Sequence, residues 1–155
     1  MIAIIVAIDK NRGIGNKGTM PWKIKGELER FKSLTTGNVV VMGRRTFEAI
    51  GKPLKNRMNV IVSSTLDINE ENCISVRSLQ EALEKYKNQD IYISGGSQLY
   101  QEALAYAERL YITEIDMEAE VDTYFPEFNK EQYHKQIEKE VQGEINYRYC
   151  TYFKK

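Results

Sequence analysis

The sequence has 155 residues, 42% of them hydrophobic, and its 22 basic side chains balance 22 acidic ones. This length predicts one domain, residues 1–155, whose core needs neither disulfides nor metal, and the absence of net charge gives no reason to expect a nucleic-acid or membrane partner. With only Cys73, Cys150 and His134 present, Cys-rich metal centres, zinc chemistry and triads built on another histidine are excluded.

The first predicted element is a strand at residues 2–8, "IAIIVAI". Short unbroken runs of Ile and Val are typical of strands that are covered on both faces. The run is too short to span a bilayer, and it lacks the basic flank and cleavage site of a signal peptide. We therefore expect a soluble, cytoplasmic protein.

A glycine-rich segment follows, in which Gly13, Gly15 and Gly18 match the pattern G-x-G-x-x-G. A dinucleotide-binding fingerprint needs these glycines at a strand-to-helix turn and an acidic residue at the end of the next strand. Here Pro21 precedes any helical pattern, and the next predicted strand ends in Gly-Arg-Arg. The segment is therefore predicted to be a flexible loop.

A helix is predicted just past Trp22. Its apolar residues fall within one sector of about 120°: Ile24, Leu28, Phe31 and Leu34. Glu27 falls in the same sector, whereas the other charged residues point elsewhere: Lys25, Glu29, Arg30 and Lys32. Two explanations stay open for Glu27. An acid in the first turn can cap backbone N–H groups, or a carboxylate held among apolar groups has a raised pKa that suits acid chemistry or a protonatable ring.

Residues 38–42 form the next predicted strand, and "GRRTF" follows it. In open α/β sheets, ligands bind beyond the carboxyl ends of the strands. A glycine turn before Arg44, Arg45 and Thr46 at a helix start suits a phosphate, and two arginines where NAD enzymes place an acid favour the 2′-phosphate of NADP. A solvated basic helix start is the alternative.

The strands predicted at 58–64 and 73–76 lead to further polar groups. The first ends in Ser63 and Ser64, and the second is followed by Arg77. These side chains could complete the same anion site. A helix is predicted over 78–87, with Ser78 and Glu81 as its capping box.

A buried strand is predicted at 90–94, and Gly95-Gly96 separates it from a helix. Backbone can approach a pyrophosphate closely there, or the glycines can simply allow tight packing. After a strand at 109–115, period-two segments on either side of a turn at 143–146 predict an antiparallel edge hairpin. His134 lies in this hairpin, where a solvated position is expected.

The alternation of strands and helices predicts an α/β fold. We expect a single domain with a mostly parallel central sheet of about eight strands, flanked by about four helices, with an antiparallel C-terminal edge hairpin.

Several stretches resemble the dihydrofolate reductase family, and together they cover nearly the whole chain. They are "IGNKGTMPW", Glu27 with Phe31-Lys32, "VVVMGRRTFEAIGKPLKNRMNVIVSS", "ISGGSQLY", "LYITEID" and "DTYFP". The resemblance implies transfer of hydride from NADPH to 7,8-dihydrofolate, giving 5,6,7,8-tetrahydrofolate. It also implies a cytoplasmic monomer that binds antifolate inhibitors and no metal.

On the folate side, the resemblance implies that Glu27 binds the 2-amino-4-oxo edge of the pterin and supports protonation at N5. Tyr100, Thr113 and a water near Trp22 would complete the polar network, and Met20 would lie in a lid over the nicotinamide. Arg57 would pair with the α-carboxylate of the glutamate tail. The other implied substrate contacts are Ile5, Ala7, Leu28, Phe31, Lys32, Ile50 and Ser94.

On the cofactor side, the resemblance implies contacts with NADPH from seven segments, and a cis peptide bond between Gly95 and Gly96. The implied contacts are Ala7, Ile14, Gly15, Gly43, Arg44, Arg45, Thr46, Ser63, Ser64, Arg77, Gly95, Gly96, Ser97, Gln98, Leu99 and Thr123.

Two positions depart from the commonest bacterial pattern of the family. Glu27 stands where Asp is usual, and Ser94 stands where an aliphatic residue is usual. With the preceding Lys25-Gly26 and the later "INY" at 145–147, they resemble the trimethoprim-insensitive bacterial branch. This resemblance predicts an altered inhibitor response and the same reaction.

Two rival functions fit part of the pattern. A reductase acting on a riboflavin-pathway pyrimidine would share the cofactor half, but Glu27, Phe31 and Arg57 argue against it. A non-catalytic nucleotide-binding or receiver-like module would need acids at the end of its third strand, where serines stand here.

Overall fold

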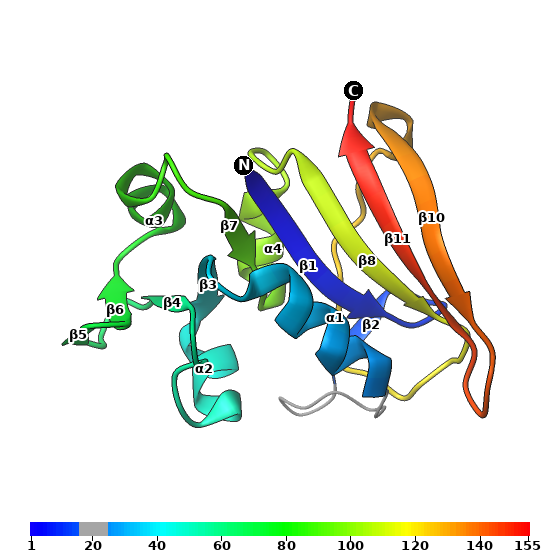
Figure 1. Cartoon of the computed structure of the whole chain (residues 1–155), viewed down its shortest axis with the longest axis horizontal. Coiled ribbons are helices and arrows are strands. Elements are labelled where there is room, and N and C mark those ends of the chain that lie inside the picture. The colour runs from blue at the N-terminus through cyan, green and yellow to red at the C-terminus, as the bar shows by residue number, and fades with distance from the viewer. Residues whose placement is uncertain (16–24) are drawn as a thin grey trace.

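The computed structural model describes residues 1–15 and 25–155. In chain order its elements are β1 (Ile2–Ile8), β2 (Gly13–Gly15), α1 (Lys25–Thr35), β3 (Val39–Gly43), α2 (Arg44–Ile50), β4 (Met58–Val62), β5 (Asn69–Glu70), β6 (Cys73–Val76), α3 (Leu79–Lys85), β7 (Ile91–Ile93), α4 (Ser97–Ala103), β8 (Arg109–Ile115), β9 (Thr123–Tyr124), a 3-10 turn (Lys130–Gln132), β10 (Tyr133–Val141) and β11 (Tyr147–Lys154). Figure 1 shows the strands spread across the molecule, from β5 at one end to β10 at the other.

One sheet of nine strands organises the described residues, in the order β10-β11-β8-β1-β7-β3-β4-β6-β5. The strands from β8 to β6 pair in parallel, whereas β10, β11 and β5 add antiparallel pairs. The predicted α/β fold, with its mostly parallel sheet and antiparallel C-terminal hairpin, is confirmed. Because β7 lies between β1 and β3, the carboxyl ends of three buried strands meet at the middle of the sheet.

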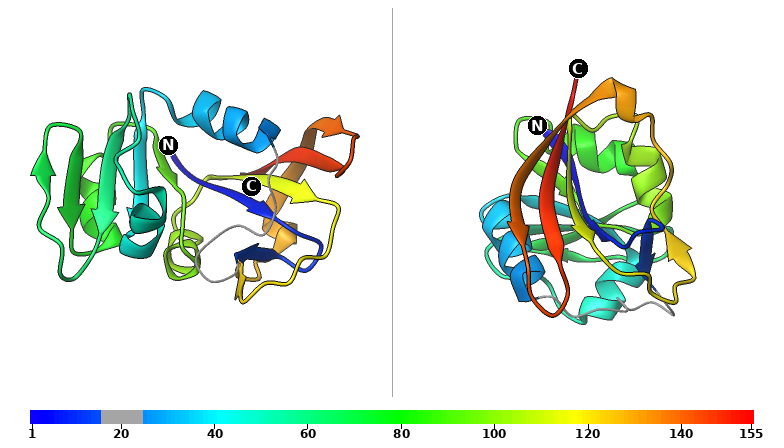
Figure 2. Two further views of the ribbon diagram at one scale, coloured as in Figure 1. Left: turned by 90° about the horizontal axis from the view of Figure 1, so that it is seen from below. Right: turned by 90° about the vertical axis from the view of Figure 1, so that its right-hand side faces the viewer.

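The apolar run of β1 is buried on both faces, as expected for a central parallel strand. Ile4 packs in a cluster that includes Leu99 of α4. Ile5 packs in a separate cluster that Phe31 of α1 joins. Helices α1 and α4 therefore cover opposite faces of the sheet, as Figure 2 shows.

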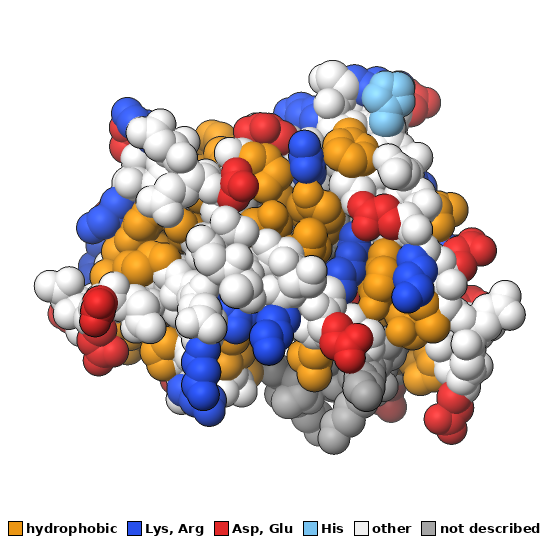
Figure 3. Space-filling model, viewed as in Figure 1, with side chains coloured by type: hydrophobic (Ala, Val, Ile, Leu, Met, Phe, Trp, Pro, Cys, Tyr) orange, Lys and Arg blue, Asp and Glu red, His pale blue; other side chains and the backbone are white. Residues whose placement is uncertain are grey.

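The outer strand of the hairpin is polar. Residues 134–140 of β10 are all exposed, including His134, so its predicted solvated position is confirmed. Charged side chains on an edge strand discourage pairing with a second sheet. On the face drawn in Figure 3, basic and acidic side chains intermingle with small hydrophobic patches. No helix among the described residues is long and apolar enough to cross a membrane.

The prediction of a flexible loop in the glycine-rich segment is wrong at Gly13, which begins strand β2 and pairs with β9. The buried carboxylate of Asp9 holds the preceding turn, because its Oδ1 accepts from the N–H groups of Asn11 at 2.8 Å and Gly13 at 2.7 Å. A Cβ at Gly13 would lie 2.7 Å from Val121 and 2.8 Å from Asp9. This glycine therefore permits close packing between segments.

The predicted inward face of α1 is also partly wrong. Leu28, expected in the buried sector, is 74% exposed, whereas Arg30, expected to point away, is only 9% exposed. The face that meets the sheet is centred near Glu27 and Leu34, roughly 100° around the helix from Leu28. Ile24, which helped to define the predicted sector, lies outside the described residues.

Candidate active site

Glu27 lies in the first turn of α1. Burial raises the pKa of its carboxyl from 4.5 to about 7, against the effects of a hydrogen bond with Thr113 and the nearby charge of Arg30, which both lower it. Within the described part of the chain, its buried Oε2 has no hydrogen-bond partner. Of the two explanations left open by the sequence, these observations favour the buried acid with a raised pKa.

Buried groups of α4 and β8 lie near this carboxylate, and both adjoin β1. The Tyr100 hydroxyl of α4 donates to the backbone oxygen of Ile5 at 2.9 Å, and its pKa is raised by burial and by the charge of Glu27. Ala7 of β1 is the sheet partner of Thr113 in β8. Two other predicted residues, Met20 and Trp22, lie outside the described residues.

The sequence did not identify Arg30 as a site residue. Its Nη1 donates to Thr113 Oγ1 at 3.2 Å, and its Nη2 donates to the backbone oxygen of Cys150 at 3.1 Å. Its guanidinium carbon lies 4.7 Å from the centre of the Tyr149 ring. The spacing of three residues from Glu27 was the available signal, since residues three apart lie side by side on a helix.

The first turn of α1 also lies close to β11. A Cβ at Gly26 would collide with the hydroxyl groups of Tyr147 and Tyr149. A glycine before Glu27 therefore lets the helix start approach these tyrosines, which places the carboxylate deep against the sheet.

Arg57, directly before β4, lies beside Phe31 of α1. The Arg57 guanidinium carbon is 6.0 Å from the centre of the Phe31 ring, and its Nη1 donates to Thr35 Oγ1 at 3.2 Å. Partial burial lowers the pKa of Arg57. Three other residues with predicted substrate contacts are exposed: Leu28, Lys32 and Ile50.

Three glycines bring the carboxyl ends of β3 and β7 together. The Gly43 N–H donates to the Gly95 carbonyl at 2.8 Å, and the Gly95-Gly96 bond is cis, as the resemblance implied. A Cβ at Gly95 would lie 3.4 Å from both Thr46 Oγ1 and the Tyr100 hydroxyl. The glycine peptide thus adjoins both the start of α2 and the group next to Glu27. The first turn of α4 follows, with Ser97, Gln98 and Leu99.

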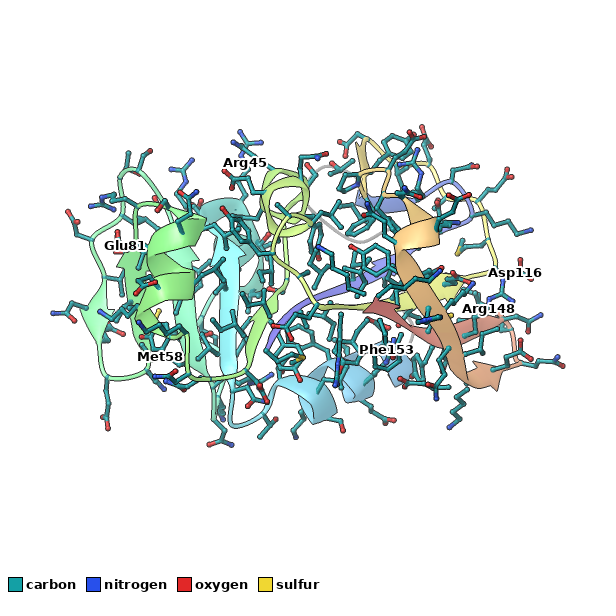
Figure 4. All side chains as sticks on the ribbon, turned by 90° about the horizontal axis from the view of Figure 1, so that it is seen from above. Arg45, Met58, Glu81, Asp116, Arg148 and Phe153 are labelled. Atoms are coloured by element: carbon teal, nitrogen blue, oxygen red, sulfur yellow. The ribbon has the colours of Figure 1, made fainter. Side chains whose placement is uncertain are left out.

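Arg44 and Arg45 are exposed at the start of α2. The Nε of Arg44 lies 3.5 Å from Glu48, one turn along the helix. Figure 4 shows Arg45 projecting outward from the molecule. Both guanidinium groups are accessible to an anion in solution.

Ser63 and Arg77 brace the turn that follows β4. The Ser63 hydroxyl accepts from the N–H of Leu66 at 3.0 Å. Arg77 donates to the backbone oxygen of Ser63 at 2.8 Å and pairs with Asp67. Ser64, in the same turn, is exposed.

The remaining predicted cofactor contacts meet across the small sheet of β2 and β9. Gly15 pairs with Thr123, and Ile14 packs against the main core. Residues far apart in the sequence therefore form one surface.

This set of donors fits a dinucleotide beside a polar ring. Arginines and hydroxyls bind phosphate through charge-assisted hydrogen bonds, and glycines at the middle of the sheet permit close backbone approach. Buried polar atoms are normally hydrogen-bonded. Among the described residues, Glu27 Oε2 and Ser94 Oγ are buried without a partner, which fits a ligand with polar edges.

Comparisons with known proteins agree with this arrangement. A family model described as dihydrofolate reductase matches residues 1–154. The dihydrofolate reductase of Bacillus subtilis (strain 168) is 39% identical over 160 residues, covering 100% of this chain and 95% of that protein. Dihydrofolate reductase type A13 of Escherichia coli is 35% identical, covering 97% and 93%. A solved dihydrofolate reductase from Enterococcus faecalis, complexed with NADP(H) and RAB-propyl, has a TM-score of 0.91 at 33% identity and covers 99% of this chain and 96% of its own. The chain is therefore a member of the dihydrofolate reductase family.

Proposed function

We propose that this chain reduces 7,8-dihydrofolate to 5,6,7,8-tetrahydrofolate with NADPH, and that Glu27 is the acid that holds the pterin. Membership of the family supports the reaction and the cofactor. One observation carries the assignment to Glu27: a buried carboxyl with a pKa of about 7 and an unpartnered Oε2.

Glu27 is suited to both tasks assigned to it. The 2-amino-4-oxo edge of a pterin presents N–H donors, which pair well with carboxylate oxygens. Oε2 is available for this edge, while the hydrogen bond with Thr113 fixes the carboxylate in place. A pKa near the working pH lets the group take up and release a proton, which supports protonation at N5.

The surrounding residues supply alignment and exclude water. We assign the pterin and benzoyl contacts to Ile5, Ala7, Leu28, Phe31, Ile50 and Ser94, and the tail carboxylate to Arg57, with Lys32 nearby. The exposure of Leu28 and Ile50, at 74% and 40%, supports this assignment, because large apolar side chains gain from being covered by a ring.

When bound, NADPH supplies hydride from C4 of its nicotinamide. We assign its phosphates to the exposed groups Arg44, Arg45 and Ser64, together with Thr46 and the turn braced by Ser63 and Arg77. The remaining assigned contacts are Ala7, Ile14, Gly15, Gly43, Gly95, Gly96, Ser97, Gln98, Leu99 and Thr123.

The reaction is tested by the loss of NADPH absorbance when dihydrofolate is added to the purified protein. We expect NADPH to be oxidised when dihydrofolate is present. We expect no oxidation of NADPH with a riboflavin-pathway pyrimidine or without a substrate. Oxidation with the pyrimidine alone would assign the protein to the rival reductase.

Replacing both Arg44 and Arg45 by Ala should weaken binding of NADPH far more than binding of NADH. A charge-assisted hydrogen bond contributes roughly 1.5–3 kcal/mol, and only NADPH carries the 2′-phosphate. Dissociation constants for both cofactors, measured by fluorescence titration, provide the test. Replacing the exposed Lys52 and Lys55 removes the same charge from the adjoining segment and serves as the control. Equal losses for both cofactors would contradict the assignment.

Replacing Arg57 by Leu should raise KM for dihydrofolate about 10- to 100-fold while NADPH affinity is unchanged, because the charged partner of the tail carboxylate is lost. Steady-state kinetics and NADPH titration measure the two effects. Lys55→Leu, at an exposed position nearby, is the control. An unchanged KM would refute the assignment of Arg57.

We also propose that residues 1–155 act as one cytoplasmic, monomeric domain. One sheet runs through the described residues, and the exposed, charged edge strand β10 disfavours pairing between copies. The free thiols of Cys73 and Cys150 suit a reducing compartment. Analytical ultracentrifugation tests the oligomeric state.

A further inference from the structure

Arg30 is a cation buried one helical turn after Glu27. Its side chain is only 8% exposed, and a buried guanidinium is costly unless its donors are paired. Its partners are Thr113 Oγ1 at 3.2 Å, the Cys150 carbonyl at 3.1 Å and, at 3.7 Å, Glu138 Oε2. These contacts hold the positive charge in one place beside the carboxylate.

Arg30 also determines which way the Thr113 hydroxyl points. A hydroxyl has one proton to donate and can accept two hydrogen bonds. Because the Arg30 N–H donates to this oxygen, the hydroxyl proton remains for the carboxylate of Glu27, with which Thr113 is hydrogen-bonded. In such a chain, each hydrogen bond polarises the next.

We propose that Arg30 is a positioning residue, which directs the Thr113 proton toward Glu27 and keeps a positive charge beside the carboxylate, so that Glu27 is more often ionised. The consequence of this role of Arg30 for turnover rests on the proposed function. The effect of Arg30 on the ionisation of Glu27 does not, because it can be measured in the protein without substrate.

The other charged and titratable groups around this pair come from four elements: Tyr100 of α4, Tyr111 of β8, Tyr149 and Cys150 of β11, and Glu138 of β10. Burial raises the pKa of Tyr100, and it raises the pKa of Tyr149 to about 12 and that of the Cys150 thiol to about 11. These three groups are therefore neutral near pH 7. Glu138 is the anion that faces Arg30 from the hairpin.

The positions of Arg30 and Glu138 predict opposite effects on Glu27. Arg30→Met removes the neighbouring cation and the donor to Thr113, so the pKa of Glu27 should rise. Glu138→Gln removes the anion that offsets this cation, so the pKa of Glu27 should fall. Gln retains an oxygen that can accept from Thr151, as Glu138 does. A purely structural role for Arg30 predicts no such difference in sign.

The test is the titration of the Glu27 carboxyl carbon by NMR in the protein without substrate, together with the pH profile of kcat/KM for dihydrofolate. We expect the midpoint to move up by about one pH unit or more in Arg30→Met, and down in Glu138→Gln. The matching inflection in the pH profile should move in the same directions. Arg30→Lys should restore part of the wild-type midpoint. Lys139→Met changes net charge by the same amount at an exposed site of β10 and should leave the midpoint unchanged.

Equal midpoints for wild type and Arg30→Met would overturn the proposal, as would shifts of the same sign in Arg30→Met and Glu138→Gln. If Arg30→Met does not fold, an unchanged midpoint in Glu138→Gln overturns it, and a lower midpoint supports it. A protein that titrates as expected but does not reduce dihydrofolate would count against the proposed function alone.

Discussion

Glu27→Gln should stabilise the protein at pH 8 while removing most of its turnover. The pKa of Glu27 is raised from 4.5 in the unfolded chain to about 7 in the fold. The contribution of the protonated Glu27 carboxyl to the stability of the fold is therefore complete below pH 4.5, and it is lost as the pH rises through 7. At pH 8 the buried charge costs roughly 3 kcal/mol. Gln is neutral at every pH and avoids this cost.

The same substitution should remove most of kcat at pH 7, because Gln cannot supply the charge that pairs with the pterin edge or a proton for N5. Urea unfolding at pH 5 and pH 8, with kcat at pH 7, measures both effects. Glu29→Gln, at an exposed position of the same helix, should change neither. The role given to the buried carboxylate would be wrong if Glu27→Gln kept near-wild-type kcat. It would also be wrong if the free energy of unfolding of the variant, relative to the wild type, were no greater at pH 8 than at pH 5.

The parts of the fold that the sequence predicted are those in which a local pattern and tertiary burial agree. The unbroken apolar run at residues 2–8 is fully buried only if both faces of the strand are covered, and β1 is covered on both faces. The predicted capping box is present: α3 begins at Leu79 with Ser78 as its N-cap, and the Ser78 hydroxyl accepts from the Glu81 N–H at 3.1 Å. Strand β2 was missed because it depends on the turn held by Asp9 and on pairing with β9. Neither the turn nor the pairing leaves a periodic pattern in the sequence.

The site was predicted unevenly for a similar reason. The inward direction of Glu27 followed from helical geometry alone. Leu28 and Arg30 were assigned to the wrong faces because the prediction sorted side chains by polarity. At this site the sheet offers a polar partner, Thr113, and a carbonyl oxygen of Cys150, so a guanidinium is buried and a leucine is exposed.

Trimethoprim should inhibit the wild-type protein weakly. Its protonated diaminopyrimidine would pair with the carboxylate at position 27, and Glu is one methylene longer than Asp, so the ring should be displaced from the apolar wall. The Ser94 hydroxyl offers less apolar contact than an aliphatic side chain. The buried cation Arg30 also disfavours a second cation next to Glu27. Substrate should be less affected, because the proposed contact with Arg57 would anchor its tail independently.

One methylene in a fitted pocket changes affinity by roughly 1–3 kcal/mol. We therefore expect Glu27→Asp and Ser94→Ile each to lower the Ki for trimethoprim about 10-fold or more, with a further decrease in the double variant and a modest change in KM. Ser33→Ile, on the exposed side of α1, is the control for added apolar surface. Tight inhibition of the wild type, or no tightening in any variant, would refute this explanation.

The contact between Arg30 and the Cys150 carbonyl links the start of the chain to β11, which lies between β8 and β10 in the sheet. Every residue assigned to substrate or cofactor lies at or before Thr123. A ribosome that has reached residue 140 has therefore added every residue proposed to contact a ligand. It has not yet added β11, the strand that accepts a hydrogen bond from Arg30 and pairs with β8. The nascent chain at that stage holds Arg30 without one of its partners. Strand β11 thus supports the proposed ligand site although none of its residues is assigned to a ligand, so losing this strand should impair the site without removing a ligand contact.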